Sequence, residues 1–167
     1  MEGSINLNII QFAAILFTGL LAGLMYGYSC SVSAGLGSLH DDIYLLSFQS
    51  INVSIQNPYF FLSFIGNLLI LPIASWLAYQ HYNSVTFYFL AGATVVYIIG
   101  VFGVTVFGNI PLNQQLANFK VLNATESEIR QMRMAFESSW NNYHTIRTVA
   151  AITAFCLAIL SLLTRKI

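Results

Sequence analysis

Four long runs without a charged residue limit what this chain can fold into. No Asp, Glu, Lys or Arg occurs in residues 9–33, 58–80 or 84–108, and a fourth apolar run follows Arg147. A helix needs about 20 mostly apolar residues to cross the hydrocarbon layer of a bilayer. We therefore expect an all-α fold, an integral membrane four-helix bundle formed by a single domain, residues 1–167, with spans at about 8–34, 58–80, 84–108 and 140–164.

Composition and charge agree with a multi-pass membrane protein. Of the 167 residues, 57% are hydrophobic and 7% charged, and the mean hydropathy is +0.71. The formal net charge is zero and the basic residues form no cluster, so the lipid bilayer, and not a nucleic acid, is the expected partner. Cys30 and Cys156 lie inside apolar runs, where we expect small buried side chains and no disulfide.

The segment between the first two runs, SLHDDIYLLSFQSINVSIQNP, predicts a short amphipathic helix on the membrane surface. Ser38 and Asp41 have the spacing of a capping box, and Leu45 and Phe48 recur at a helical interval. The Asn-Pro pair at 57–58 should end this helix and open the second span, because proline is tolerated in the first turn of a helix.

The fourth helix should extend outside the membrane, on the cytosolic or the periplasmic side. Thr125 and Glu128 have capping-box spacing, which predicts a long helix that runs through Trp140 into the bilayer. Before it, Pro111 should break the chain into a turn at the end of the third span.

Small residues predict how the spans pack. Glycine and serine recur every four residues in the first span, and alanine does so in the fourth: Gly19, Gly23, Gly27, Ser31 and Gly35, and Ala150, Ala154 and Ala158. Such stripes let helix backbones approach closely, so we expect these two spans to pack together. The glycine stripe can alternatively face a partner subunit, as in a homo-oligomer. Arg165 and Lys166 favour cytoplasmic N- and C-termini.

Polar residues of three segments should meet on one side of the membrane. Trp140, His144 and Arg147 share one helical face at the start of the fourth span. Ionisable groups within a membrane usually mark function; the alternative is an arginine that reaches the headgroups, with Trp140 as an interfacial anchor. The other segments contribute amide pairs that either orient a ligand or cap and join helices: Gln49 with Asn52, and Asn109 with Asn113.

Metal and cofactor binding stay open at this point. His40, Asp41, Asp42 and His144 are the residues that could form a metal site, and His40 with His144 is a conceivable haem pair. No HExxH, CxxC, P-loop or Rossmann glycine pattern occurs in the sequence. The cofactor is thus unknown: none, a metal and haem are all compatible with these residues.

Three segments in this order, FQSINVSIQNPYFFLSFIG, GNIPLNQQL and WNNYHTIRT, resemble the anthrone oxygenase-like family of small four-span membrane proteins. Members that give the family its name oxidise an anthrone to an anthraquinone with molecular oxygen, without a recognised flavin or nicotinamide site. Carried over by position, the resemblance implicates Gln49, Asn52, Asn109, Pro111, Asn113, Trp140, His144 and Arg147.

The resemblance implies an oxygenase acting on a hydrophobic aromatic small molecule, an anthrone or a phenol. His144 would act as the general base, and Arg147 with Asn109 or Asn113 would stabilise the oxyanion. Trp140 and Tyr143 would bind the aromatic rings. The alternative is a non-enzymatic tetraspan protein that binds a lipid, a quinone or a partner membrane protein, and only the enzyme would consume oxygen.

Overall fold

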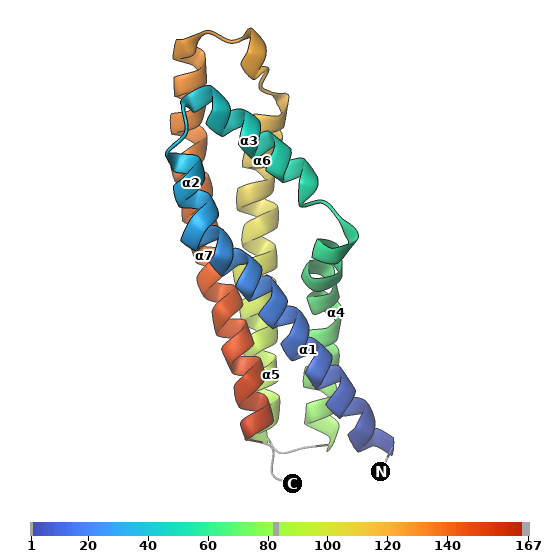
Figure 1. The fold of residues 1–167 in the computed structure, drawn as a ribbon. Coiled ribbons are helices and arrows are strands. Elements are labelled where there is room, and N and C mark those ends of the chain that lie inside the picture. Colours follow the sequence, from blue (N-terminus) through green and yellow to red (C-terminus); the bar gives the residue numbers. More distant parts are fainter. Residues whose placement is uncertain (1, 82–83, 165–167) are drawn as a thin grey trace.

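The computed structural model describes residues 2–81 and 84–164, which form helices joined by short connections (Figure 1). Four helices are long and apolar enough to cross a membrane: Asn8–Gly37, Pro58–His81, Ser84–Asn118 and Glu126–Leu163. They correspond in order to the four apolar runs. The expected all-α membrane bundle is therefore confirmed, and a lipid bilayer is the environment that these helices fit.

Two of the four long helices contain π-helical turns. The first consists of α1 (Glu2–Gly27), the π-helical segment η1 (Tyr28–Val32) and α2 (Ser33–Gly37). The third consists of α5 (Ser84–Val96), the π-helical segments η2 (Tyr97–Gly103) and η3 (Thr105–Asn109), and α6 (Ile110–Asn118). Wide turns of this kind often occur at functional sites.

The predicted turn at Pro111 is not present, and that prediction was wrong. Pro111 lies in the first turn of α6, directly after η3, and the helix continues to Asn118. A proline inside a regular helix clashes with the carbonyl group one turn earlier and lacks an N–H group. At the start of α6 the wide turn of η3 comes before it, so the chain accommodates the ring without breaking.

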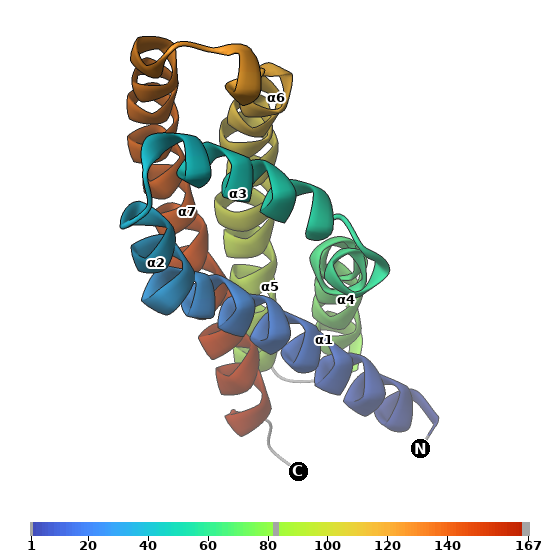
Figure 2. The ribbon, with the colours of Figure 1, turned by 45° about the horizontal axis from the view of Figure 1, so that its top comes forward.

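The long helices pack into a bundle. In it, α1 crosses obliquely over α4 (Pro58–His81) and α7 (Glu126–Leu163) (Figures 1 and 2). α5 packs against α4 and α7. The short helix α3 (Asp41–Ser54) lies across one end of the bundle, beside α6 and the first half of α7. The start of α1 and the end of α7 lie together at the opposite end.

The buried side chains form two apolar cores. The first, here called the spanning core, lies among the four long helices and includes Leu21, Leu71, Leu90, Val101 and Ala154. The second, here called the cap core, joins α3, α6 and the outer half of α7; its members include Tyr44, Phe48, Leu116, Phe136 and Trp140. α7 passes through both cores, so its residues near Trp140 lie at the boundary between them.

The first and fourth spans pack together as expected, but most of the glycine stripe faces away from the contact. A Cβ on Gly19 would meet the Phe155 ring at 2.8 Å, whereas the positions of three other glycines are open: Gly23, Gly27 and Gly35. A closer approach occurs between the third and fourth spans, because a Cβ on Gly100 would come within 2.6 Å of the Ala150 Cβ.

Cys30 and Cys156 are free but exposed on the outer surface, which corrects the expectation that they are buried.

A further correction concerns the start of α3, where Ser38 does not form the predicted cap. His40 occupies the N-cap position, and the Ser38 hydroxyl donates to the Gly35 carbonyl at 2.8 Å. The predicted Thr125–Glu128 capping box at the start of α7 is confirmed, with Thr125 N–H donating to Glu128 Oε2 at 2.7 Å.

Arg133 of α7 holds the α2–α3 connection in place of a cap. Its guanidinium donates to the carbonyls of Gly37 (2.9 Å) and Leu39 (2.7 Å), and to the carboxylates of Asp41 (2.9 Å) and Glu137 (2.8 Å). The group also lies 4.4 Å from the centre of the Tyr44 ring, and burial raises the pKa of the Tyr44 hydroxyl above its ordinary value. Arg133 thereby fixes α3 over the end of the bundle.

We predict that Gly100→Ala destabilises the protein by about 1–3 kcal/mol, the usual cost of overpacking. The added methyl group has no space beside Ala150. Gly23→Ala is the matched control, because its position is open and alanine is the better helix former. Thermal unfolding in detergent measures both. Equal melting temperatures for the two variants would contradict the close contact between η2 and α7.

We also predict that Arg133→Ala loosens the α2–α3 connection, because hydrogen bonds of a charged group are worth about 1.5–3 kcal/mol. Hydrogen exchange of residues 37–45 should accelerate. Arg130→Ala serves as the control: its side chain is 77% exposed and lies 3.9 Å from Asp41, so its removal should have little effect. Similar hydrogen-exchange rates of residues 37–45 in both variants would argue against the role of Arg133 in holding the α2–α3 connection.

Candidate functional site

His144 and Arg147 lie on the inward face of α7, between the cap core and the spanning core. His144 is 5% exposed and Arg147 is 8% exposed. Trp140, one turn earlier, and Ala151, one turn later, are buried on the same face. The spacing of these residues in the sequence predicted this orientation.

The His144 ring is held by α1 and by its own helix. Its Nε2 lies 3.1 Å from Ser29 Oγ, 3.2 Å from the Met25 carbonyl oxygen and 3.3 Å from Thr148 Oγ1. The Ser29 hydroxyl itself donates to the Met25 carbonyl and the Thr148 hydroxyl to the His144 carbonyl. These hydroxyl oxygens are therefore acceptors for Nε2, which carries the proton of the neutral ring.

Arg147 contacts the other nitrogen of the His144 ring and supports the same position of the proton. Its Nη2 donates to His144 Nδ1 at 3.1 Å, and its Nη1 donates to Thr105 Oγ1 at 3.2 Å. A guanidinium group can only donate, so Nδ1 must be the acceptor. Arg147 also lies 5.4 Å from the centre of the Trp140 ring, which gives the cation a contact with an aromatic face.

Arg147 has no carboxylate partner among the described residues, whose ion pairs involve Arg130 and Arg133. Its Nε is buried and has no hydrogen-bond partner in the part of the chain that the structure describes. A buried cation without a counter-charge is costly, and such a group inside a membrane protein generally serves a function. The arrangement is suited to receive a negatively charged oxygen.

π-helical turns of two spans lie beside the His144–Arg147 pair. η1 of the first span supplies Tyr28 and Ser29, and η3 of the third supplies Thr105 and Asn109. Because a π turn contains an extra residue, it shifts the following side chains around the helix axis. In both helices residues of a π-helical segment contact α7: Tyr28 and Ser29 lie against His144, and Thr105 accepts a hydrogen bond from Arg147.

Asn109 and Asn113 hydrogen-bond to Trp140, whereas the hydrogen bonds of Arg147 go to Thr105 and His144. The Asn109 amide donates to the Trp140 carbonyl at 3.3 Å, and the Trp140 indole N–H donates to Asn113 Oδ1 at 2.8 Å. The Trp140 ring stacks on His144 with a centroid distance of 5.1 Å and an angle of 11°. These contacts fix Trp140, which in turn supports one face of the His144 ring.

Gln49, Asn52 and Tyr143 lie outside this cluster. The Gln49 amide donates to the carbonyls of Leu116 and Phe119, and so caps the end of α6. Asn52 is half-buried on α3, and in the described part of the chain neither amide side chain hydrogen-bonds to His144 or Arg147. Tyr143 is 38% exposed on the outer side of α7.

The proposed metal ligands are also not brought together. In residues 2–81 and 84–164, no three His, Cys, Asp or Glu side chains are close enough to share a metal ion. His40, Asp41 and Asp42 lie at the start of α3, where Asp41 pairs with Arg133, whereas His144 is held by Ser29 and Arg147.

Four residues that contact the site were not predicted from the sequence: Tyr28, Ser29, Thr105 and Thr148. Thr105 lies four residues before Asn109 and Thr148 four residues after His144, so helical spacing could have indicated both. Tyr28 and Ser29 gave no such signal, because their role depends on how α1 crosses α7.

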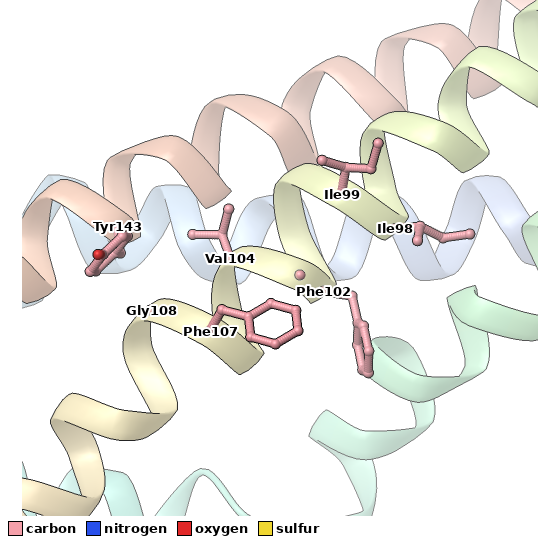
Figure 3. Close-up of a pocket in the computed structure, with 8 residues that line it drawn as sticks. Ile98, Ile99, Phe102, Val104, Phe107, Gly108 and Tyr143 are labelled. Carbon is pink, nitrogen blue, oxygen red and sulfur yellow. The ribbon is translucent and has the colours of Figure 1, made fainter.

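An open apolar groove of about 540 Å³ lies on the outer side of the third span. Phe102 and Phe107 project into it, and Tyr143 of α7 lies at one end (Figure 3). Gly108 permits this approach, since a Cβ there would meet the Tyr143 ring at 2.8 Å. The groove borders η2 and η3, and η3 also carries the buried residues Thr105 and Asn109.

The fold and this site define a four-span membrane protein with a buried, uncompensated cation beside a histidine. The sequence model for anthrone oxygenase matches residues 60–157. This match covers more than half of the chain, which therefore belongs to the anthrone oxygenase family. The matched region includes Thr105, His144 and Arg147, whereas Tyr28 and Ser29 precede it. Searches of curated proteins and of solved structures gave no match.

We predict that neutral His144 carries its proton on Nε2, because Arg147 donates to Nδ1. Nitrogen-15 chemical shifts of histidine-labelled protein measure the tautomer, and a His144→Gln variant assigns the signal. Arg147→Met should change the Nδ1 shift of His144 and leave the exposed His40 unaffected. A ring protonated on Nδ1 in the unsubstituted protein would contradict the assignment.

Proposed function

We propose that the protein oxidises a lipid-soluble aromatic substrate, an anthrone or a related phenol, with molecular oxygen. The observation that carries this proposal is the buried guanidinium of Arg147, which has no carboxylate partner among the described residues and has an unpartnered Nε. Membership of the anthrone oxygenase family supports the reaction type.

The proposed reaction balances with oxygen as the oxidant. Removal of a proton from the methylene carbon of an anthrone gives an enolate, whose electrons reduce oxygen as a carbon–oxygen bond forms. The resulting hydroperoxide loses water to give the quinone. One anthrone and one oxygen molecule thus yield one anthraquinone and one water molecule, and the protein must chiefly deprotonate the substrate and stabilise its anion.

Arg147 is suited to stabilise the enolate oxygen. Its positive charge lies in apolar surroundings, where electrostatic interactions are stronger than in water. Its Nε–H group is an unused donor, and among the described residues the acceptors for the other nitrogens are the neutral His144 Nδ1 and Thr105 Oγ1. A negatively charged oxygen would be a stronger acceptor than either.

His144 would act as the base through Nδ1. That atom accepts from Arg147 in this structure, so its lone pair becomes available when the guanidinium turns toward the substrate oxygen. Substrate binding and release of the base would therefore be coupled through one hydrogen bond. Met25, Ser29 and Thr148 hold the opposite nitrogen, Nε2, and keep the ring in place while Nδ1 takes the proton.

The aromatic and amide residues have supporting roles in this proposal. Trp140 supports His144, and Asn109 and Asn113 hold Trp140. Tyr143, beside the outer groove, would contact a flat substrate that arrives from the bilayer. Gln49 caps α6 and so maintains the cap core.

We predict that Arg147→Met lowers anthrone-dependent oxygen uptake by about 100-fold or more, as for other residues that stabilise an oxyanion. Methionine keeps the apolar bulk and removes an unpaired buried charge, so the melting temperature should not fall. Arg130→Met is the matched control at an exposed position. Uptake is measured with an oxygen electrode after subtraction of the protein-free rate.

Near-normal uptake by Arg147→Met would contradict the role of Arg147. Tight binding of an anthrone by the unsubstituted protein without oxygen consumption would instead identify a binding protein.

A further inference from the structure

Tyr28 places a buried hydroxyl group without a partner at the same site. Among the described residues, no side chain or carbonyl group hydrogen-bonds to its Oη, and the atom is inaccessible to solvent. A tyrosine hydroxyl that is buried in a protein usually has a partner, because the unpaired group is costly. Phenylalanine would fill the same space without this cost.

Ring contacts fix the position of Tyr28 relative to His144 and Trp140. The Tyr28 ring centre lies 4.7 Å from that of His144 and 5.2 Å from that of Trp140. The adjacent Ser29 bonds to His144 Nε2, which ties η1 to α7 at this point. Tyr28 therefore reaches the site from the first span, opposite the helix that carries Arg147.

The unpartnered atoms of the site are complementary to a phenol. Within residues 2–81 and 84–164, Tyr28 Oη and Arg147 Nε are donors without acceptors, and Asn109 Oδ1 is an acceptor without a donor. All three belong to residues that contact Trp140, His144 or both. An ionised aromatic oxygen would satisfy the two donors, and the rings of Trp140 and His144 lie beside them.

We propose that Tyr28 binds the substrate directly, its hydroxyl and the Arg147 guanidinium together holding the ionised oxygen of a phenol or enolate. This inference rests on the proposed function and assigns to the first span a residue that selects the anionic form of the substrate. The reacting oxygen accepts one hydrogen bond from each residue, and Tyr28 keeps its proton throughout.

A coloured phenol that oxygen does not oxidise tests the inference without turnover. 2-Hydroxyanthraquinone absorbs at longer wavelength when it is ionised, so its spectrum reports the charge of the bound dye. The detergent-purified full chain is titrated with the dye over a range of pH, with and without the Tyr28→Phe substitution. We expect Tyr28→Phe to weaken binding of the anion about tenfold, the usual scale for a hydrogen bond to a charged group, and binding of the neutral dye less than twofold.

Tyr97→Phe is the matched control. The Tyr97 hydroxyl is also buried, but it donates to the Phe64 carbonyl at 2.6 Å in the spanning core. Its removal should lower the melting temperature and leave ionisation of the bound dye unchanged. Tyr28→Phe should leave the melting temperature no lower and decrease ionisation of the bound dye. Equal ionisation of the dye bound to unsubstituted protein and Tyr28→Phe would overturn the inference.

Oxygen uptake separates this inference from the proposed function. One outcome is that ionisation of the bound dye depends on Tyr28 and Arg147 while anthrone causes no oxygen uptake. In that case Tyr28 is confirmed as a ligand of the anion and the oxygenase proposal fails. If uptake depends on Arg147 while Tyr28→Phe changes neither uptake nor dye ionisation, the inference fails and the oxygenase proposal stands.

Discussion

The hydrogen bond from Arg147 to His144 is the interaction on which the rest of the site depends. Arg147 also donates to Thr105 of the third span, and His144 contacts the Met25 carbonyl and Ser29 of the first. One pair of side chains on α7 thus connects three of the four spanning helices. The described residues provide no carboxylate to balance the charge of the guanidinium, which is the basis for proposing an anion site at this junction of helices.

The two apolar cores explain how such a cation is kept in place. The spanning core encloses one side of the pair, and the cap core, which includes Phe48 and Trp140, encloses the other. Arg133 in turn holds α3 over the cap core through bonds to two backbone carbonyls and two carboxylates. Two arginines of α7 therefore differ in their surroundings: Arg133 has acidic partners and stabilises the fold, whereas Arg147 has no acidic partner among the described residues.

Much of the fold could be predicted from the sequence, because long uncharged runs have few structural solutions in a bilayer. The inward face of α7 followed from the spacing of Trp140, His144 and Arg147. Contacts between spans were harder to predict, since they depend on crossing angles and on π-helical turns that leave no clear periodic signal. For this reason Tyr28 was not predicted as a residue of the site. Gln49 was predicted as a possible ligand residue, and in the structure its amide caps α6.

The most direct test of the central claim is an experimental structure of the protein with a bound hydroxyanthraquinone. The account predicts a ligand oxygen within hydrogen-bond distance of Arg147 Nε and a guanidinium turned away from His144 Nδ1. A ligand bound elsewhere, with the Arg147–His144 hydrogen bond unchanged, would contradict the assignment of this cation as the oxyanion site.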